Sequence, residues 1–125
     1  MNSEMLKART KKFAVNVAKL CEDLPPRLST LAYSKQLIRC SSSVGANYRA
    51  ACRAKSLADF INKLKIVEEE TDESVYFLEL IEELDPARKE SLASLKKEGN
   101  ELLSILVASI NTARQRHRTN HQSKI

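Results

Sequence analysis

The stretch SLADFINKLKIVEEETDESVYFLELIEEL, residues 56–84, decides the fold of this chain. Its apolar positions recur in steps of three and four, which is the period of an amphipathic α-helix. Ser56, followed three residues later by Asp59, forms a capping-box pattern with Asp in place of Glu and sets the beginning of the helix. At about 1.5 Å per residue, this helix is nearly 40 Å long. The positions predicted to face a core are Leu57, Phe60, Ile61, Leu64, Val67, Thr71, Val75, Leu78 and Ile81.

Two shorter helices are predicted upstream of this segment. The first covers about residues 3–22, and the proline pair at 25–26 stops it, because a proline excludes the preceding residue from the α region. The second is expected to begin after Ser29 or Thr30, either of which is a suitable N-cap, and to run to about residue 53. Its middle holds Ser, Gly and Ala at residues 41–46, which form helices weakly and let another helix approach closely.

A fourth helix is predicted downstream. Asp85 is expected to cap it, with Pro86 as its first residue, and the apolar period keeps its phase through Gly99. The chain is polar from about residue 116, so residues 1–116 are predicted to form the domain and residues 117–125 a frayed tail. Short connections place successive helices antiparallel. The fold class is therefore all-α, as an up-down-up-down four-helix bundle.

Composition supports a helical, single-domain protein. The chain has 125 residues, of which 42% are apolar, and only five are Gly or Pro, which is too little turn punctuation for a β-rich domain. The N-terminus has no apolar segment behind a basic start, and no stretch is long enough to cross a membrane, so a cytoplasmic protein without a membrane partner is expected. The three widely spaced cysteines predict small buried side chains or free thiols: Cys21, Cys40 and Cys52.

Charge is distributed unevenly along the chain. Residues 1–67 carry a net charge of +9, residues 68–85 carry −9, and residues 86–125 carry +5, for a total of +5. A basic chain with one acidic segment is suited to binding nucleic acid, or to pairing the acidic and basic faces of several copies.

The second and third predicted helices resemble a known family. Residues 36–48 read QLIRCSSSVGANY, similar to the signature of the four-helix-bundle proteins encoded in intervening sequences of bacterial 23S ribosomal RNA genes. Residues 56–60, SLADF, are similar to the beginning of that family's third helix, and residues 70–80 resemble its acidic-then-apolar segment. The resemblance covers about residues 10–112. The chain departs from the family pattern at Arg49, Ala50 and Ala51.

The resemblance implies the same antiparallel bundle and assembly into a homopentamer. It also implies a relation to the accessory protein of diversity-generating retroelements, which binds RNA and a reverse transcriptase. RNA or a nucleic-acid-binding protein is therefore the expected partner besides further copies of the chain.

Candidate residues for phosphate contact follow the second helix and enter the third. A functional interpretation makes them a basic stripe on nucleic acid, whereas the alternatives are a solvated face or ion pairs with the acidic segment of another subunit. Tyr48 is the only aromatic residue near the stripe, which gives base stacking weak support. The candidates are Arg39, Arg49, Arg53, Lys55, Lys63 and Lys65.

Candidate contacts for register or assembly lie on the same two helices. Asn47 is a poor helix former in mid-helix, which suggests either a hydrogen bond that fixes register or a surface position. Ser43 precedes it by one turn, and three acids complete the set: Glu69, Glu70 and Glu73.

No motif points to catalysis, a metal or a cofactor. His117 and His121 both lie in the predicted tail, so the bundle offers neither a histidine base nor the Glu-x-x-His ligands of diiron bundles. Two glycines are too few for a phosphate-binding or dinucleotide loop. We therefore expect a non-enzymatic homo-oligomer that binds RNA or a ribonucleoprotein, with a scaffold without nucleic-acid binding as the alternative.

Overall fold

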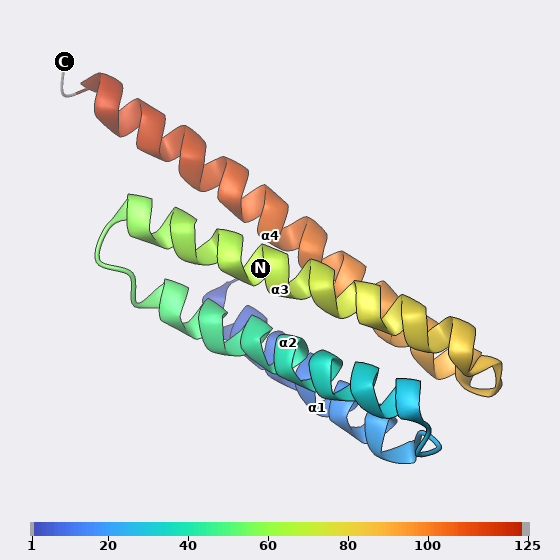
Figure 1. The fold of residues 1–125 in the computed structure, drawn as a ribbon. Helices are drawn as coiled ribbons and strands as arrows, with labels where there is room; N and C mark the ends of the chain where they lie inside the picture. The colour runs from blue at the N-terminus through green and yellow to red at the C-terminus, as the bar shows by residue number, and fades with distance from the viewer. Residues whose placement is uncertain (1, 124–125) are drawn as a thin grey trace.

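The computed structural model describes residues 2–123 as four long helices that run antiparallel in turn (Figure 1). These are α1 (Ser3–Asp23), α2 (Leu28–Cys52), α3 (Leu57–Leu84) and α4 (Lys89–Ser123), with a 3-10 turn, η1 (Pro86–Arg88), before α4. The predicted all-α, up-down-up-down four-helix bundle is confirmed. None of these helices is long and apolar enough to cross a membrane.

Each helix packs against its neighbours in sequence, and α1 closes the bundle against α4. Within residues 2–123, the diagonal pairs α1–α3 and α2–α4 make no close backbone contact. Of the four pairs of neighbouring helices, α1 and α4 make the fewest close backbone contacts. We call the line along which they meet the α1–α4 seam. The α1–α2 and α3–α4 connections lie at one end of the bundle, and the α2–α3 connection lies at the other (Figure 1).

The core runs along the bundle axis and draws side chains from every helix. Most of the predicted α3 stripe is buried, whereas Leu57 and Phe60, at the beginning of the helix, are only half-buried. Thr71 and Ser74 are fully buried, and their hydroxyls donate to carbonyl oxygens one turn earlier in α3, at 2.7 and 2.8 Å. The largest enclosed side chains are Phe13, Leu37, Leu64, Leu78, Ile81, Leu92, Leu102 and Leu106.

The small residues of α2 allow a close helix approach, as the sequence predicts. A Cβ atom added to Gly45 would lie 3.2 Å from Oγ1 of Thr10 on α1. Ser41 is buried, and Ser42 donates to the carbonyl of Ile38 at 2.6 Å, so these hydroxyls are satisfied within α2. Tight packing therefore compensates for the weak helix propensity of this run.

The beginning of α2 differs from the prediction. The N-cap is Arg27, so Ser29 and Thr30 are inside the helix and the expectation that either caps it is wrong. Thr30 stabilises the helix start as its third residue: its hydroxyl accepts from the backbone N–H of Arg27 and donates to the carbonyl of Pro25. By contrast, Ser56 caps α3 as predicted, accepting from the N–H of Asp59 at 3.0 Å.

The α3–α4 connection contains a turn that the sequence did not predict. Pro86 opens a 3-10 turn, α4 begins only at Lys89, and the Asp85 side chain makes no cap hydrogen bond to this turn. The Asp85 carboxylate instead accepts from Arg88, which also donates to the carbonyl of Asp23. Arg88 thereby ties the two connections at this end of the bundle together.

The helix α4 runs through Gly99, as predicted, but it also continues past residue 116. Residues 117–123, which are predicted to form the tail, are helical, and residues 124–125 lie outside the described part of the chain. Ala113 is the last buried side chain of α4 up to residue 121. Figure 1 shows the final turns of α4 extending beyond the other three helices.

Candidate nucleic-acid interface

Arg39, one of the predicted phosphate contacts, forms ion pairs with another helix of its own chain. It lies in the middle of α2 and pairs with two acids of α3 in the same chain, Glu70 at 3.4 Å and Glu73 at 2.8 Å. The hydrogen bond that Arg39 donates to Glu73 raises the pKa of the Arg39 guanidinium above its ordinary value. The charge that was assigned to a phosphate or to another subunit is thus matched within the protomer.

The other predicted bases gather where α2 ends and α3 begins. Arg49, Arg53, Lys55 and Lys65 are exposed, and none of them forms an ion pair among the described residues. These four side chains are therefore available to an external anion.

Lys63 is engaged locally instead. It pairs with Asp59 one turn earlier in α3 at 2.7 Å, and this hydrogen bond lowers the pKa of the Asp59 carboxyl. Its charge therefore contributes less to the surface than those of its unpaired neighbours.

Three further basic residues, all on α4, lie at the same end of the bundle, and the sequence analysis does not predict them as candidates. Arg114, Arg116 and Arg118 are exposed, without an ion pair among the described residues, and residues 102–123 contain no acid. Arg114 and Arg116 lie within the predicted domain and Arg118 in the predicted tail, and none of the three is among the predicted phosphate contacts. We call the exposed bases of both regions the basic end: Arg49, Arg53, Lys55, Lys65, Arg114, Arg116 and Arg118.

Two grooves open at the basic end. One, of about 450 Å³, lies between the beginning of α3 and the end of α4, where Phe60 and Arg116 line it. The other, of about 670 Å³, follows the small residues between α1 and α2, with Arg49 and Lys11 on its walls. Both are open surface grooves, and the second is lined by the acid Glu4 as well as by basic residues.

Tyr48 does not provide a stacking platform at this end. Only 7% of it is exposed, and it belongs to the core. Burial and a hydrogen bond with Cys52 raise the pKa of its hydroxyl. The three cysteines are free: Cys40 is buried, and Cys21 and Cys52 are half-buried.

The residues predicted to set register make local contacts in the protomer. Asn47 donates from Nδ2 to the carbonyl of Ser43 at 2.9 Å, and Ser43 donates to the carbonyl of Arg39 at 2.9 Å, both within α2. Glu69 is exposed on α3. Their role in assembly remains a prediction.

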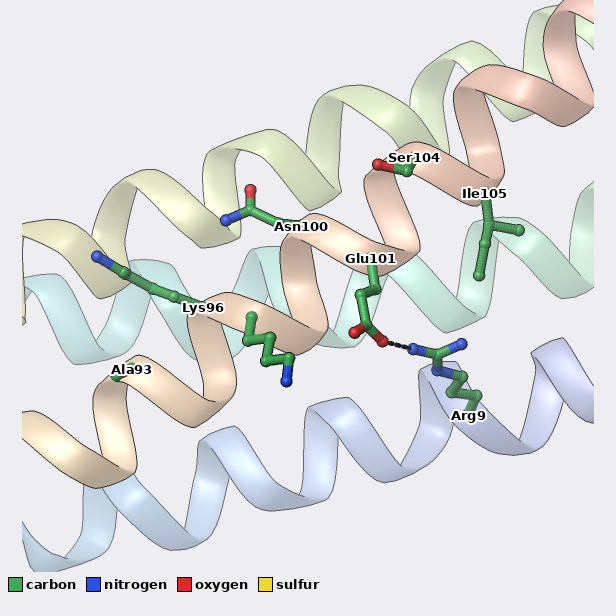
Figure 2. Close-up of a pocket in the computed structure, with 8 residues that line it drawn as sticks. Arg9, Ala93, Lys96, Asn100, Glu101, Ser104 and Ile105 are labelled. Carbon is green, nitrogen blue, oxygen red and sulfur yellow. Dashed lines mark hydrogen bonds and ion pairs between the residues drawn. The ribbon is translucent and has the colours of Figure 1, made fainter.

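A further groove, of about 720 Å³, lies along the α1–α4 seam (Figure 2). Arg9 reaches across it from α1 to Glu98 and Glu101 of α4, and its two bonds to Glu98 measure 2.7 and 2.6 Å. Figure 2 shows Asn100 and Ser104 on the α4 wall beside this bridge. The groove holds no nucleophile next to a histidine, because His117 and His121 lie further along α4.

No group of three or more His, Cys, Asp or Glu side chains within residues 2–123 is placed to hold an ion. His117 and His121 lie with ring centroids 4.3 Å apart, and His121 bonds to the carbonyl of His117.

Comparison with known proteins agrees with this architecture. The family model described as "23S rRNA-intervening sequence protein" matches residues 5–108. The crystal structure of a protein of unknown function from the S23 ribosomal protein family of Bacteroides thetaiotaomicron is similar, with a TM-score of 0.80 and 34% identity over 89% of this chain and 99% of that one. No curated protein matches the chain.

Proposed function

The chain belongs to the family of 23S rRNA-intervening sequence proteins, and from this premise we propose that it is a non-enzymatic homo-oligomer that binds structured RNA or a ribonucleoprotein through its basic end. The observation that carries this proposal is the concentration of unpaired, exposed bases there. Residues 46–67 and 102–123 hold eight Lys or Arg and a single acid, Asp59. Such a surface attracts polyanions and releases their counterions on contact.

RNA binding is tested with a fluorescently labelled structured RNA titrated at 50 and 200 mM salt. The variant Arg49→Ala/Arg53→Ala/Lys55→Ala removes three charges from the basic end, and we expect its affinity to fall by about tenfold or more. A matched control, Lys19→Ala/Lys35→Ala/Lys89→Ala, removes three exposed charges near the opposite end and should bind within about twofold of wild type. Absence of binding at 50 mM salt would overturn the proposal.

Self-association is supported by exposed apolar residues on the α1–α2 face. Leu31 and Ile38 of α2 are 50% and 39% exposed, and they share a helix face with Ser42. Ser42 and Val15 of α1 line the groove between the two helices. Exposed apolar side chains that share a helix face are suited to contact with another subunit.

The corresponding test is sedimentation of an Ile38→Asp variant. Val107→Asp on α4 is its matched control, since Val107 is 40% exposed. We expect Ile38→Asp to sediment as smaller species with unchanged helix content, and Val107→Asp to sediment like wild type. Equal sedimentation of all three proteins contradicts assembly through this face.

The same face supports the second candidate function, a protein-interaction scaffold without nucleic-acid binding. In that case, the acidic segment of α3 serves assembly. Glu69 tests this better than Glu70, because Glu70 already pairs with Arg39 within the chain. If Glu69→Lys dissociates the oligomer while RNA fails to bind at any salt concentration, the scaffold is the correct function.

A further inference from the structure

The final turns of α4 form a helix that the bundle does not support. Within residues 114–121 no side chain is buried, and only His117 is half-buried. A helix that is polar all round gains little from packing, and isolated helices of this length are marginal in water. We call residues 114–121 the α4 arm.

Two arginines and two histidines share one face of the α4 arm. Arg114, His117, Arg118 and His121 follow at steps of three, one and three, which places all four on the same side of the helix. A favourable interaction with the helix dipole reaches only the last turn, whereas Arg114 lies more than two turns before Ser123. The helix dipole therefore gives no stabilisation to Arg114.

Aromatic residues are nearly absent from the surface around the arm. Tyr48 is buried, and Phe60 is half-buried beside the α4 groove. The aromatic contacts of Tyr33, Tyr76 and Phe77 form elsewhere, on α2 and the second half of α3. Proteins that bind single strands stack bases on exposed aromatic rings, and this end of the molecule has no such platform.

From these observations we infer that the basic end takes double-helical RNA by its phosphate backbone, with the α4 arm as one of two contacting elements. The other element is the α2–α3 connection with Arg53 and Lys55, which lies at the same end of the bundle (Figure 1). Two separate basic elements without stacking surfaces are suited to the paired backbones of a duplex. This inference rests on the proposed function and names its ligand class and an additional binding element.

The test compares three labelled probes at 50 mM salt: an RNA hairpin, an unstructured single-stranded RNA of equal length, and a B-form DNA duplex of the hairpin sequence. We expect the hairpin to bind at least about tenfold more tightly than either of the other probes. Arg114→Ala/Arg118→Ala should weaken hairpin binding by about tenfold and reduce the slope of log affinity against log salt by about one to two. Arg114→Lys/Arg118→Lys keeps the charges and should restore most of the affinity. Lys19→Ala/Lys35→Ala, which removes two exposed charges near the other end, should have little effect.

Amide hydrogen exchange gives an independent measurement. Residues 115–121 should exchange rapidly in the free protein and become protected with the hairpin, because an unsupported helix opens readily.

The outcomes separate the two proposals. Tight hairpin binding that depends on Arg53 and Lys55 but is unchanged in Arg114→Ala/Arg118→Ala overturns the role of the arm and leaves the proposed function in place. Equal affinity for single-stranded RNA, or for duplex DNA, overturns the assignment to double-helical RNA. No binding of any RNA overturns the proposed function itself.

Discussion

Gly99 shows how one residue fixes the approach of three helices. It is buried on α4, and a Cβ atom added to it would lie 2.8 Å from Cγ2 of Val75 on α3 and 3.5 Å from Cζ of Phe13 on α1. Intrinsic propensity favours alanine in a helix by about 1 kcal/mol, but the added methyl group has no space at this position.

We therefore predict that Gly99→Ala destabilises the fold by about 1–2 kcal/mol in urea denaturation, despite its better helix propensity. Val75→Ala in the same chain should recover part of the loss, since it removes the clashing methyl group. Gly45→Ala is the matched comparison: its new Cβ would be 3.2 Å from Thr10 Oγ1, and we expect a smaller change. A Gly99→Ala variant more stable than wild type would contradict this packing.

The buried hydroxyl of Tyr48 predicts a loss of stability at alkaline pH. Burial and Cys52 raise its pKa in the folded protein, while an unfolded tyrosine titrates near pH 10. The folded chain thus keeps a proton that the unfolded chain releases, so the contribution to stability is complete below about pH 9 and is lost as pH rises further.

Urea denaturation of wild type and Tyr48→Phe at pH 7, 9 and 10.5 measures this contribution. The free energy of unfolding of wild type should fall more steeply above pH 9 than that of Tyr48→Phe. If the unfolding free energies of the two proteins fall equally with pH, the Tyr48 hydroxyl is not the cause of the alkaline loss of stability.

Among the helix pairs, α1 and α4 pack least closely, and the ion pairs of Arg9 join them. Its guanidinium bonds Glu98 through two nitrogens and Glu101 through one, and only 26% of the Arg9 side chain is exposed. A bidentate, partly buried pair is worth more than a typical surface pair, and lysine cannot reproduce its geometry.

Arg9→Ala should cost about 1 kcal/mol of unfolding free energy, with Arg9→Lys close to it. A double-mutant cycle with Glu98→Ala isolates the coupling between the two side chains. Lys7→Ala, whose partner Glu4 is 82% exposed, is the control and should change stability little. Coupling indistinguishable from zero would mean that apolar packing alone closes the α1–α4 seam.

Sequence patterns predicted the helices well because their boundaries carry strong local signals. The proline pair at 25–26, the Ser56 cap and the phase of apolar residues through Gly99 each correspond to an observed feature. The beginning of α2 was misplaced because Thr30 stabilises it from the third helical position, a role that composition does not distinguish from an N-cap. The last turns of α4 were missed because their side chains lack the apolar stripe on which the prediction depended.

The candidate site was predicted only where local sequence is sufficient. Arg49, Arg53 and Lys55 follow one another along the chain and are exposed together. The pairing of Arg39 with Glu73 depends on the register between α2 and α3, and the approach of Arg114 to this end depends on the antiparallel return of α4. Neither is a property of any single segment.

For the whole molecule, the antiparallel fold places the basic and acidic segments of the sequence in different parts of the surface. Segments separated by about fifty residues bring their bases to one end, while most acids lie along α3 and at the α3–α4 connection. A field of this kind favours oriented approach of a polyanion, and its effect depends on where the charges lie and not only on their sum.

The affinity of a charge-relocated variant for the RNA hairpin tests this claim most directly. Arg49→Ala/Arg53→Ala/Lys55→Ala would be combined with lysine at three exposed positions near the opposite end, Ala32→Lys, Ala87→Lys and Ser94→Lys, which keeps the net charge at +5. The account predicts that hairpin affinity at 50 mM salt falls by about tenfold or more although the net charge is unchanged. Affinity equal to that of wild type would contradict it, because net charge rather than the basic end would then govern binding.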